Sequence, residues 1–266
     1  MRTVLIGAGR LATQLGWALR EAGHDVTAVY SRTMEAAEAL TRVVGGSPTD
    51  HLGHLPLTAD VYIVAVKDSA LQALIPQLTQ GREGQLFVHT AGSMPMTVFE
   101  GYADRCGVLY PMQSFSKERR VDFAEIPVFI EGADPLIRQL AESISRRVYP
   151  LSTADRKYLH LAAVFACNFA NHCYALAADV LERHGLPFDV LLPLIDETAR
   201  KVHELHPLDA QTGPAVRYDE NVINMQAALL SDPAVRELYE RLSLSIHQKA
   251  TSYDQLRLRE DTGHRV

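Results

Sequence analysis

Cysteine is scarce in this sequence, with three residues among 266. Cys106, Cys167 and Cys173 are odd in number, and their spacing matches no zinc-binding pattern. Neither a disulfide framework nor a metal site is therefore expected. Free thiols are typical of proteins in a reducing compartment, so we expect a cytoplasmic location.

Positive charge is also in short supply. The chain has 26 lysine and arginine residues against 32 aspartate and glutamate residues, giving a formal net charge of −6 at pH 7. This balance argues against nucleic acid or an anionic membrane as a main partner. No stretch is expected to be apolar for long enough to span a bilayer. A strand is predicted within the first few residues, so no secretory signal is expected there.

A glycine-rich turn lies close to the N-terminus. An apolar strand over residues 4–6 runs into the pattern Gly7-x-Gly9-x-x-Ala12, and an amphipathic helix follows. Glycines often end strands for backbone reasons alone, but strand, turn and helix together favour a dinucleotide-binding motif. Such a turn brings backbone N–H groups and the positive end of the helix to a pyrophosphate. The residues predicted to contact the cofactor here are Gly7, Ala8, Gly9, Arg10, Leu11 and Ala12.

The position that usually separates NAD from NADP binding carries no acid. A second strand over residues 25–30 ends in Ser31, Arg32 and Thr33, where NAD-binding proteins commonly place a carboxylate for the ribose hydroxyl. Serine and arginine can instead hydrogen-bond and neutralise a 2′-phosphate. The alternative is that Arg32 is an exposed charge and Ser31 caps the next helix. The sequence favours NADP, with Ser31, Arg32 and Thr33 as its ligands.

Strand and helix signals alternate as far as residue 151. Besides the elements above, the patterns predict helices over 33–43, 68–78 and from 135, a loop over 45–48, and strands over 60–66, 85–89, 107–110, 126–130 and 147–149. This alternation predicts an α/β fold with a doubly wound, mostly parallel Rossmann-like sheet. We assign residues 1–151 to an NADP-binding domain.

No convincing strand is predicted from residue 152 onward. Long helices separated by turns rich in glycine and proline indicate an all-helical domain over residues 152–266, for substrate binding or dimerisation. Ser152 is the predicted N-cap of a helix that reaches about Arg183. Residues 159–181 are more apolar than a surface helix needs, and a partner subunit commonly covers such a helix. The sequence therefore predicts a homodimer through the helical domain.

Polar and small residues follow the third and fourth strands of the predicted sheet. Ligands of doubly wound sheets bind at the carboxyl ends of the strands. Lys67 and His89 could hydrogen-bond ribose hydroxyls or the substrate. Either alone is explained more readily as an exposed helix-start charge or as a satisfied histidine at the sheet rim. Their shared edge favours a cofactor site that comprises Val66, Lys67, His89, Thr90, Ala91 and Gly92, and the segment 110–115 ends the next strand.

A polar stripe is predicted on the long helix. Lys157, His160, Val164, Asn168 and Asn171 fall within an arc of about 80° at 3.6 residues per turn. Buried polar groups need partners, so the stripe is either a reaction site or a hydrogen-bonded seam without chemistry. As a site it could orient a carbonyl or imine and protonate it. His160 is the first candidate proton donor, Lys157 is the second, and Asn168 would orient the substrate.

Residues 212–219 form a turn between two predicted helices. Arg217 could bind a substrate carboxylate or phosphate through two hydrogen bonds. An ion pair between Arg217 and Asp219 is the favoured interpretation, and Asp219 could also cap the next helix.

These segments together resemble a known family. It comprises proteins assigned as NADP oxidoreductases, which pair a Rossmann-like domain with a C-terminal helical domain of unknown function. The resemblance covers essentially the whole chain and rests on residues 7–12, 30–33, 66–69, 89–93, 110–115, 159–168 and 212–214. The N-terminal half is more distantly similar to pyrroline-5-carboxylate reductases and deazaflavin-dependent NADP reductases, which also dimerise through helical domains. The resemblance implies the fold and an NADP-type site but no substrate.

The sequence thus predicts an NADP(H)-dependent oxidoreductase that transfers a hydride to a small carbonyl or imine substrate. The alternative is a non-catalytic NADP-binding sensor or scaffold. Such a protein would bind NADPH tightly without turning it over.

Overall fold

The computed structural model describes residues 1–263, with side chains as far as Arg257. The chain divides into two compact units, Met1–Ala170 and Asn171–Val266. The division falls after Ala170 rather than after the predicted residue 151. The residues between these two points belong to the first unit because the start of their helix is hydrogen-bonded to the sheet through Glu131.

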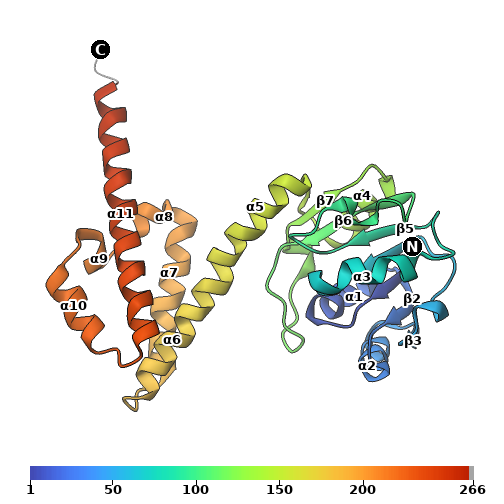
Figure 1. Ribbon diagram of the computed structural model, residues 1–266, viewed down its shortest axis with the longest axis horizontal. Helices are drawn as coiled ribbons and strands as arrows, with labels where there is room; N and C mark the ends of the chain where they lie inside the picture. The colour runs from blue at the N-terminus through green and yellow to red at the C-terminus, as the bar shows by residue number, and fades with distance from the viewer. Residues whose placement is uncertain (264–266) are drawn as a thin grey trace. The chain divides into compact units, whose positions relative to one another are not determined.

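The first unit is built around one eight-stranded sheet (Figure 1). The strand order is β3-β2-β1-β4-β5-β6-β7-β8, and every neighbouring pair is parallel except β6 with β7. The prediction of a mostly parallel Rossmann-like sheet is confirmed. The strands are β1 (Arg2–Ile6), β2 (Asp25–Tyr30), β3 (Ser47–Thr49), β4 (Val61–Val64), β5 (Leu86–His89), β6 (Arg105–Pro111), β7 (Val128–Glu131) and β8 (Val148–Pro150).

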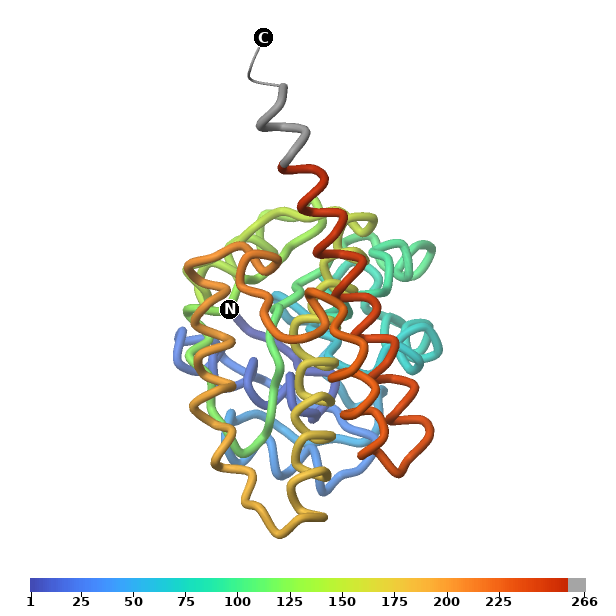
Figure 2. The backbone as a smooth tube through the Cα atoms, turned by 90° about the vertical axis from the view of Figure 1, so that its left-hand side faces the viewer, coloured from blue at the N-terminus to red at the C-terminus, as the bar shows by residue number. Residues whose placement is uncertain are grey.

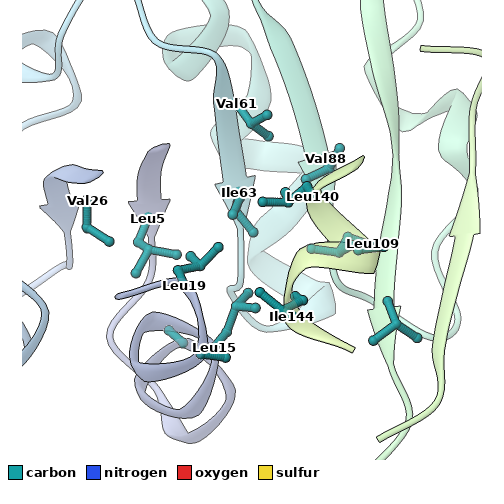
Figure 3. Close-up of a cluster of buried hydrophobic side chains, with 14 of the residues drawn as sticks. Leu5, Leu15, Leu19, Val26, Val61, Ile63, Val88, Leu109, Leu140 and Ile144 are labelled. Atoms are coloured by element: carbon teal, nitrogen blue, oxygen red, sulfur yellow. The ribbon is translucent and has the colours of Figure 1, made fainter. Parts of the chain in front are cut away.

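Apolar side chains cover both faces of this sheet. On one face α1 (Arg10–Glu21) and α4 (Pro135–Ile144) pack against the strands, as Figure 3 shows for Leu15, Leu19 and Ile144. On the other face α3 (Asp68–Thr79) buries its leucines and Ile75 against Tyr62 and Phe87. A strand buried on both faces needs a continuous apolar run, which is the pattern that predicted the central strands. Helix α2 (Met34–Val44) follows β2.

One strand was not predicted. Residues Ser47–Thr49 pair with β2 as the edge strand β3, although the sequence predicts a loop there. Pro48 lacks an N–H group, which an edge strand tolerates. Gly46 has a φ of +82°, and a Cβ atom there would lie 2.3 Å from the Val26 oxygen. The loop prediction was wrong because three residues at an edge carry no apolar alternation.

A long helical run crosses from the first unit into the second. It consists of α5 (Thr153–Ala163), a π-helical turn η4 (Val164–Phe169) and α6 (Ala170–Glu182). Its start is the predicted one, since the Ser152 hydroxyl accepts a hydrogen bond from the Asp155 N–H at 3.1 Å. By length and composition Thr153–Glu182 could cross a membrane, so the expectation that no stretch reaches that length was wrong. The core helices of soluble proteins pass the same test.

The second unit contains helices and turns and, within its described residues, no strand. The prediction of a helical C-terminal region is confirmed. Helices α9 and α10 lie beside α11 in both views (Figures 1 and 2). After α6 the helices are α7 (Leu192–Glu204), α8 (Pro207–Ala210), α9 (Pro214–Arg217), α10 (Glu220–Ala228) and α11 (Pro233–Gly263).

The turn before α10 differs from its prediction in one respect. Asp219 caps α10, as expected, because its carboxylate accepts a hydrogen bond from the Val222 N–H at 3.4 Å. Arg217 is exposed and forms no ion pair with any residue in the described part of the chain. The favoured pair of Arg217 with Asp219 was wrong, since the cap uses the carboxylate.

Candidate functional site

Gly7 shapes the turn between β1 and α1. Its N–H donates to the Tyr30 oxygen at 2.8 Å, and its φ is +119°. A Cβ atom at this position would lie 2.3 Å from the Ala65 oxygen. Both the backbone angle and the close approach of the chain after β4 therefore require glycine.

The N-terminus of α1 is open to a ligand. Gly9 is the N-cap residue, no side chain caps the helix, and a Cβ atom on Gly9 would meet nothing within 4 Å. Free N–H groups at a helix N-terminus form an anion site, so a pyrophosphate fits this cradle. Ala12 is fully buried and Leu11 is half-buried behind it, while Ala8 and Arg10 lie on either side of Gly9.

The three residues after β2 lie at its carboxyl end. The Ser31 N–H donates to the Thr49 oxygen at 3.0 Å, which fixes the backbone. Thr33, not Ser31, is the N-cap residue of α2, and its side chain makes no capping hydrogen bond. Arg32 is exposed and has no ion pair among the described residues. The alternative in which Ser31 caps the helix is therefore not realised.

The ends of β4 and β5 place the other predicted cofactor ligands at the same edge of the sheet. Lys67 is exposed at the start of α3, and Val66 is half-buried beside it. Thr90 is buried, with its N–H 3.1 Å from the Val64 oxygen. Ala91 and Gly92 are buried as well. A cofactor role for these residues stays a prediction.

His89 is fully buried and hydrogen-bonded at both ring nitrogens. Nε2 lies 3.3 Å from the Pro95 oxygen, and Nδ1 accepts from the Ala91 N–H at 3.2 Å. Burial, reinforced by the positive charge of Arg156, lowers the pKa of His89 to about 4. This geometry favours the structural interpretation, in which a neutral His89 shapes the loop that carries Ala91.

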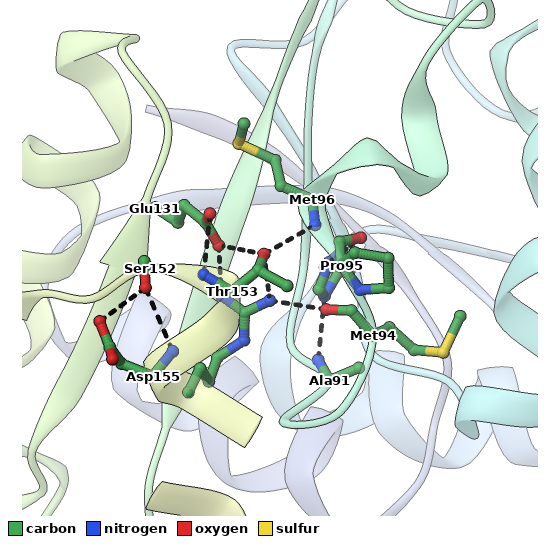
Figure 4. A network of polar contacts seen from close by, with 10 residues as sticks. Ala91, Met94, Pro95, Met96, Glu131, Ser152, Thr153 and Asp155 are labelled. Carbon is green, nitrogen blue, oxygen red and sulfur yellow. Dashed lines mark hydrogen bonds and ion pairs between the residues drawn. The ribbon is translucent and has the colours of Figure 1, made fainter. Parts of the chain in front are cut away.

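A buried arginine, Arg156, ties α5 to the sheet. Figure 4 shows the polar network around Glu131, Thr153 and Met94 to which it belongs. The Arg156 guanidinium pairs with Glu131 of β7 and donates to the Met94 oxygen at 2.6 Å. Glu131 also accepts from the N–H and hydroxyl groups of Thr153, at 2.9 and 2.7 Å. These hydrogen bonds and the pairing with Arg156 hold the pKa of Glu131 below its usual range despite the opposing effect of burial. The network fixes the first turn of α5, and His160 lies one turn further on.

A pocket of about 580 Å³ lies between α5, η4 and the chain after β6. It contains two of the three predicted catalytic residues, His160 and Asn168. Among the described side chains, no Lys, Arg, Asp or Glu lines it. Its lining consists of Tyr110, Met112, Gln113, Ser114, Phe115, Leu159, His160, Ala162, Ala163, Val164, Ala166, Cys167 and Asn168.

The third predicted catalytic residue, Lys157, does not line this pocket. It is exposed on α5, directly after the buried Arg156. The helical-wheel stripe therefore divides, because His160, Val164 and Asn168 reach the pocket while Lys157 faces solvent. The π-helical turn contributes Val164, Cys167 and Asn168, and π turns occur frequently at functional sites.

Sequence reasoning missed the partner of His160. The Tyr110 hydroxyl lies 3.0 Å from His160 Nδ1. Gly92 lies against the same ring, since a Cβ atom there would be 2.6 Å from Nδ1. The only signal in the sequence was that Tyr110 ends one strand, while the neighbouring strand, β5, leads into the loop that contains Gly92.

Comparison with known proteins agrees with this architecture. A family model described as "Rossmann-like domain" matches residues 1–112, and one described as "Domain of unknown function (DUF2520)" matches residues 126–246. No curated protein matches the chain. The fold and both matches define the class as proteins with a Rossmann-like domain followed by a helical DUF2520 domain.

The family follows from a solved relative. The "putative NADP oxidoreductase BF3122" of Bacteroides fragilis is 54% identical over 93% of this chain and 98% of its own, with a TM-score of 0.89. The chain belongs to the family of this protein.

Two further structures share the fold alone. The imine reductase of Myxococcus stipitatus in complex with NADP⁺ is 17% identical, covers 96% of this chain and 95% of its own, and has a TM-score of 0.64. Its V8 variant in complex with NAD⁺ is 16% identical over 94% of both chains, with a TM-score of 0.58. The similarity to pyrroline-5-carboxylate reductases stays a prediction.

Proposed function

We propose that this protein is an NADP(H)-dependent reductase that transfers a hydride to a small carbonyl or imine substrate. The observation that carries the proposal lies within the first unit. There a pocket lined by His160 and Asn168 accompanies a glycine turn whose helix N-terminus is open. The names of the relatives, an NADP oxidoreductase and imine reductases, support the same class of reaction.

Three groups of residues would hold the cofactor. The turn from Gly7 to Ala12 would bind the pyrophosphate, and Ser31, Arg32 and Thr33 would bind the 2′-phosphate. The chain after β4 and β5 would line the nicotinamide ribose, through Val66, Lys67, Thr90, Ala91 and Gly92. When bound, the nicotinamide supplies or accepts the hydride, while the protein provides position and a proton.

His160 is the proton donor in this proposal. Its imidazolium gives the proton on Nε2 to the carbonyl oxygen or imine nitrogen as the neighbouring carbon gains a hydride, and the ring is left neutral with its remaining proton on Nδ1. The Asn168 amide hydrogen-bonds the same substrate and orients it. Lys157 is not assigned this role, since it lies outside the pocket.

The lining of the pocket favours an uncharged reacting group. Carboxylates are commonly recognised by Arg or Lys, and neither is found in the pocket lining within the described part of the chain. Amide, hydroxyl and imidazole groups suit a carbonyl or imine instead.

We also propose a homodimer. The second unit buries three hydrophobic residues among those described, Ala215, Ile223 and Ala227. A chain of this length needs a larger core to be stable alone. The same unit also has an apolar groove of about 340 Å³ that a partner could cover. It is lined by Cys173, Leu176, Ala177, Val180, Leu181, Leu191, Leu230, Val235, Leu238, Tyr239 and Leu242. We propose a second copy of this chain as the partner, because identical chains always occur together in solution.

We propose a cytoplasmic location on separate grounds, because the three cysteines are free thiols and free thiols are typical of a reducing compartment.

Titration calorimetry tests the cofactor assignment. We expect NADPH to bind more tightly than NADH, and Arg32→Ala to weaken NADPH binding about 10- to 100-fold, because a charge-assisted pair contributes about 1.5–3 kcal/mol. NADH binding should stay unchanged. Arg42→Ala, which removes an exposed arginine of α2, serves as the matched control. Equal affinity of the wild-type protein for NADH and NADPH contradicts the assignment.

Turnover tests the reaction. NADPH oxidation is followed over a panel of imines, aldehydes and keto acids, and His160→Ala should lower kcat about 100-fold or more with NADPH affinity retained. His172→Ala removes an exposed histidine of α6 as a control. Full activity of His160→Ala removes His160 from the mechanism. Tight NADPH binding without turnover of any substrate favours the sensor.

A further inference from the structure

We propose that Tyr110, together with the backbone of Gly92, positions His160 so that its Nε2–H is the group presented to the substrate. Tyr110 acts through His160 and is therefore a positioning residue. The inference rests on the proposed function for the identity of the proton donor. The orientation of the ring can be tested without any turnover.

The position of the Tyr110 hydroxyl is fixed by the sheet. Tyr110 lies near the end of β6, opposite Phe129 of β7, and is 8% exposed. Its ring meets the His160 ring edge-on, with centroids 6.0 Å apart and an interplanar angle of 74°. The hydroxyl reaches Nδ1 at 3.0 Å. A rigid strand thus holds one nitrogen of a histidine that stands on a helix.

Gly92 packs against the same ring. A Cβ atom on Gly92 would lie 2.6 Å from Nδ1, 2.7 Å from Cγ and 3.2 Å from Cβ of His160. Real side chains essentially never approach so closely, so any other residue would displace the imidazole. The φ of Gly92 is one that any residue can adopt, so the backbone conformation does not require glycine here. The close approach of the Gly92 backbone to the His160 ring does.

The hydroxyl also determines which nitrogen carries the proton. A phenol that donates to Nδ1 leaves the neutral imidazole with its proton on Nε2. The reverse arrangement leaves the phenol proton without an acceptor, because the hydrogen bonds of the described residues include no other partner for the Tyr110 hydroxyl. Burial raises the pKa of Tyr110, so the group stays a neutral phenol and can donate.

Before any transfer to the substrate, Nε2 carries a proton both in this neutral tautomer and in the imidazolium, and the imidazolium is the form that donates. The neutral ring has Nε2–H, and the imidazolium has protons on both nitrogens. Among the described residues, no side chain or backbone group is hydrogen-bonded to Nε2. Since His160 lines the pocket, this nitrogen is the one left for a substrate oxygen or nitrogen. The substrate group therefore meets the Nε2–H donor before the transfer, and the ring returns to this tautomer when Nε2 takes a proton from solvent and Nδ1 releases its own.

The anchoring of α5 supplies the remaining constraint. Arg156, one turn before His160, is 1% exposed and paired with Glu131. The pair fixes the helix backbone, and Tyr110 with Gly92 fixes the ring. Orientation of a catalytic group by a second hydrogen bond is the usual way to keep one tautomer in place.

Nitrogen-15 NMR of the histidine side chains tests the orientation on the free protein. At a pH where His160 is neutral, we expect the Nε2–H tautomer in the wild type and a mixture of tautomers in Tyr110→Phe. Tyr158→Phe, which removes the hydroxyl of a tyrosine that is 75% exposed on the same helix, should leave the tautomer unchanged. An unchanged tautomer in Tyr110→Phe overturns the inference.

A double-mutant cycle tests the consequence for the reaction. Tyr110→Phe should lower kcat about 3- to 10-fold, the range expected for loss of one neutral hydrogen bond, without changing NADPH affinity. In the His160→Ala background the same change should have less than a 2-fold effect, since residues that act through one another are not additive. Gly92→Ala, which displaces the ring, should lower kcat by at least as much as Tyr110→Phe.

Equal effects of Tyr110→Phe in both backgrounds would mean a merely structural role and overturn the inference while the reductase proposal stands. Failure of the reductase proposal is seen separately, as absence of turnover in the wild type. The NMR result still decides the orientation of His160 in that case.

Discussion

At the scale of single residues, two neighbouring buried basic side chains, Arg156 and His89, differ in charge. The Arg156 guanidinium forms an ion pair with Glu131, whereas burial lowers the pKa of His89 and keeps its ring neutral. The two are coupled, since the charge of Arg156 contributes to the lowered pKa of His89. Arg156 therefore supplies one buried positive charge, and protonation of His89 in acid would add a second one beside it.

Acid should destabilise the first unit through His89. The unfolded histidine binds a proton near pH 6.5 and the folded one near pH 4, so protons favour the unfolded state between these values. From pH 7.5 to pH 5 this residue should cost about 2 kcal/mol of unfolding free energy. Chemical denaturation of the wild type and of His89→Gln at both pH values measures the loss of unfolding free energy between pH 7.5 and pH 5. This loss should be about 2 kcal/mol smaller in the variant.

A surface histidine provides the control for this measurement. His51→Gln should leave the loss between pH 7.5 and pH 5 unchanged, because its side chain is 70% exposed. The pKa of Glu131 is lowered, so the stability that its ionised carboxylate gives is lost mainly below its ordinary pKa of 4.5. This loss lies outside the window from pH 7.5 to pH 5. A His89→Gln protein as acid-sensitive as the wild type would contradict the assignment.

At the scale of elements, the chain after β6 depends on one residue of α1. The Gln14 side chain is 2% exposed and bonds three backbone groups. Its amide nitrogen donates to the oxygens of Ser116 and Arg119 at 2.6 and 2.9 Å, and its oxygen accepts from the Val121 N–H at 3.3 Å. The same loop lines the pocket through residues 113–115. The helix that would bind the pyrophosphate thus also holds the wall of the pocket.

Gln14→Ala should loosen this loop selectively. Loss of three hydrogen bonds to a buried amide should speed amide hydrogen exchange over residues 113–121 about 10-fold or more, since one such bond contributes roughly 1 kcal/mol. The KM for substrate should rise several-fold with little change in NADPH affinity. Gln139→Ala, at an exposed glutamine of α4, is the matched control. Unchanged exchange in the loop would show that other contacts hold it.

The π-helical turn η4 is the second feature of this scale, and no sequence pattern indicated it. A wheel at 3.6 residues per turn places Lys157, His160 and Asn168 on one face. The extra residue of a π turn rotates the later part of the helix, so the wheel no longer holds beyond Val164. Asn168, beyond the turn, nevertheless lines the pocket, whereas Lys157, before the turn, does not, so the π turn is not the reason that the predicted stripe divides.

At the scale of the whole molecule, the apolar surface of the helical run Thr153–Glu182 and of the groove in the second unit has the largest consequence. None of the most apolar window within Thr153–Glu182 is buried inside the chain. Exposed apolar patches of this extent mark interfaces. Lys157, His160, Asn168, Asn171 and His172 interrupt the run, which favours a protein partner over lipid.

A charge in the groove should therefore disrupt the assembly. Light scattering after size exclusion should give twice the 29.5 kDa of the chain for the wild type, and Leu238→Glu should shift the protein to the monomer or lower its solubility. Glu240→Lys, an exposed position on the same helix, should remain dimeric. A monomeric wild type, or its partition into lipid vesicles, would contradict the homodimer.

The sequence by itself determined the glycine turn after β1 and the mostly parallel sheet. Gly7, Gly9 and Ala12 follow from local backbone geometry, and alternating strand and helix signals suffice for a parallel sheet because each signal is local. Tertiary structure alone decided which side chains line the pocket beside η4. Spacing along a helix gives the angle of a side chain but not its neighbour, so it could not separate His160 from Lys157. The strand that carries Tyr110 and the loop that carries Gly92 meet His160 only after the sheet has formed.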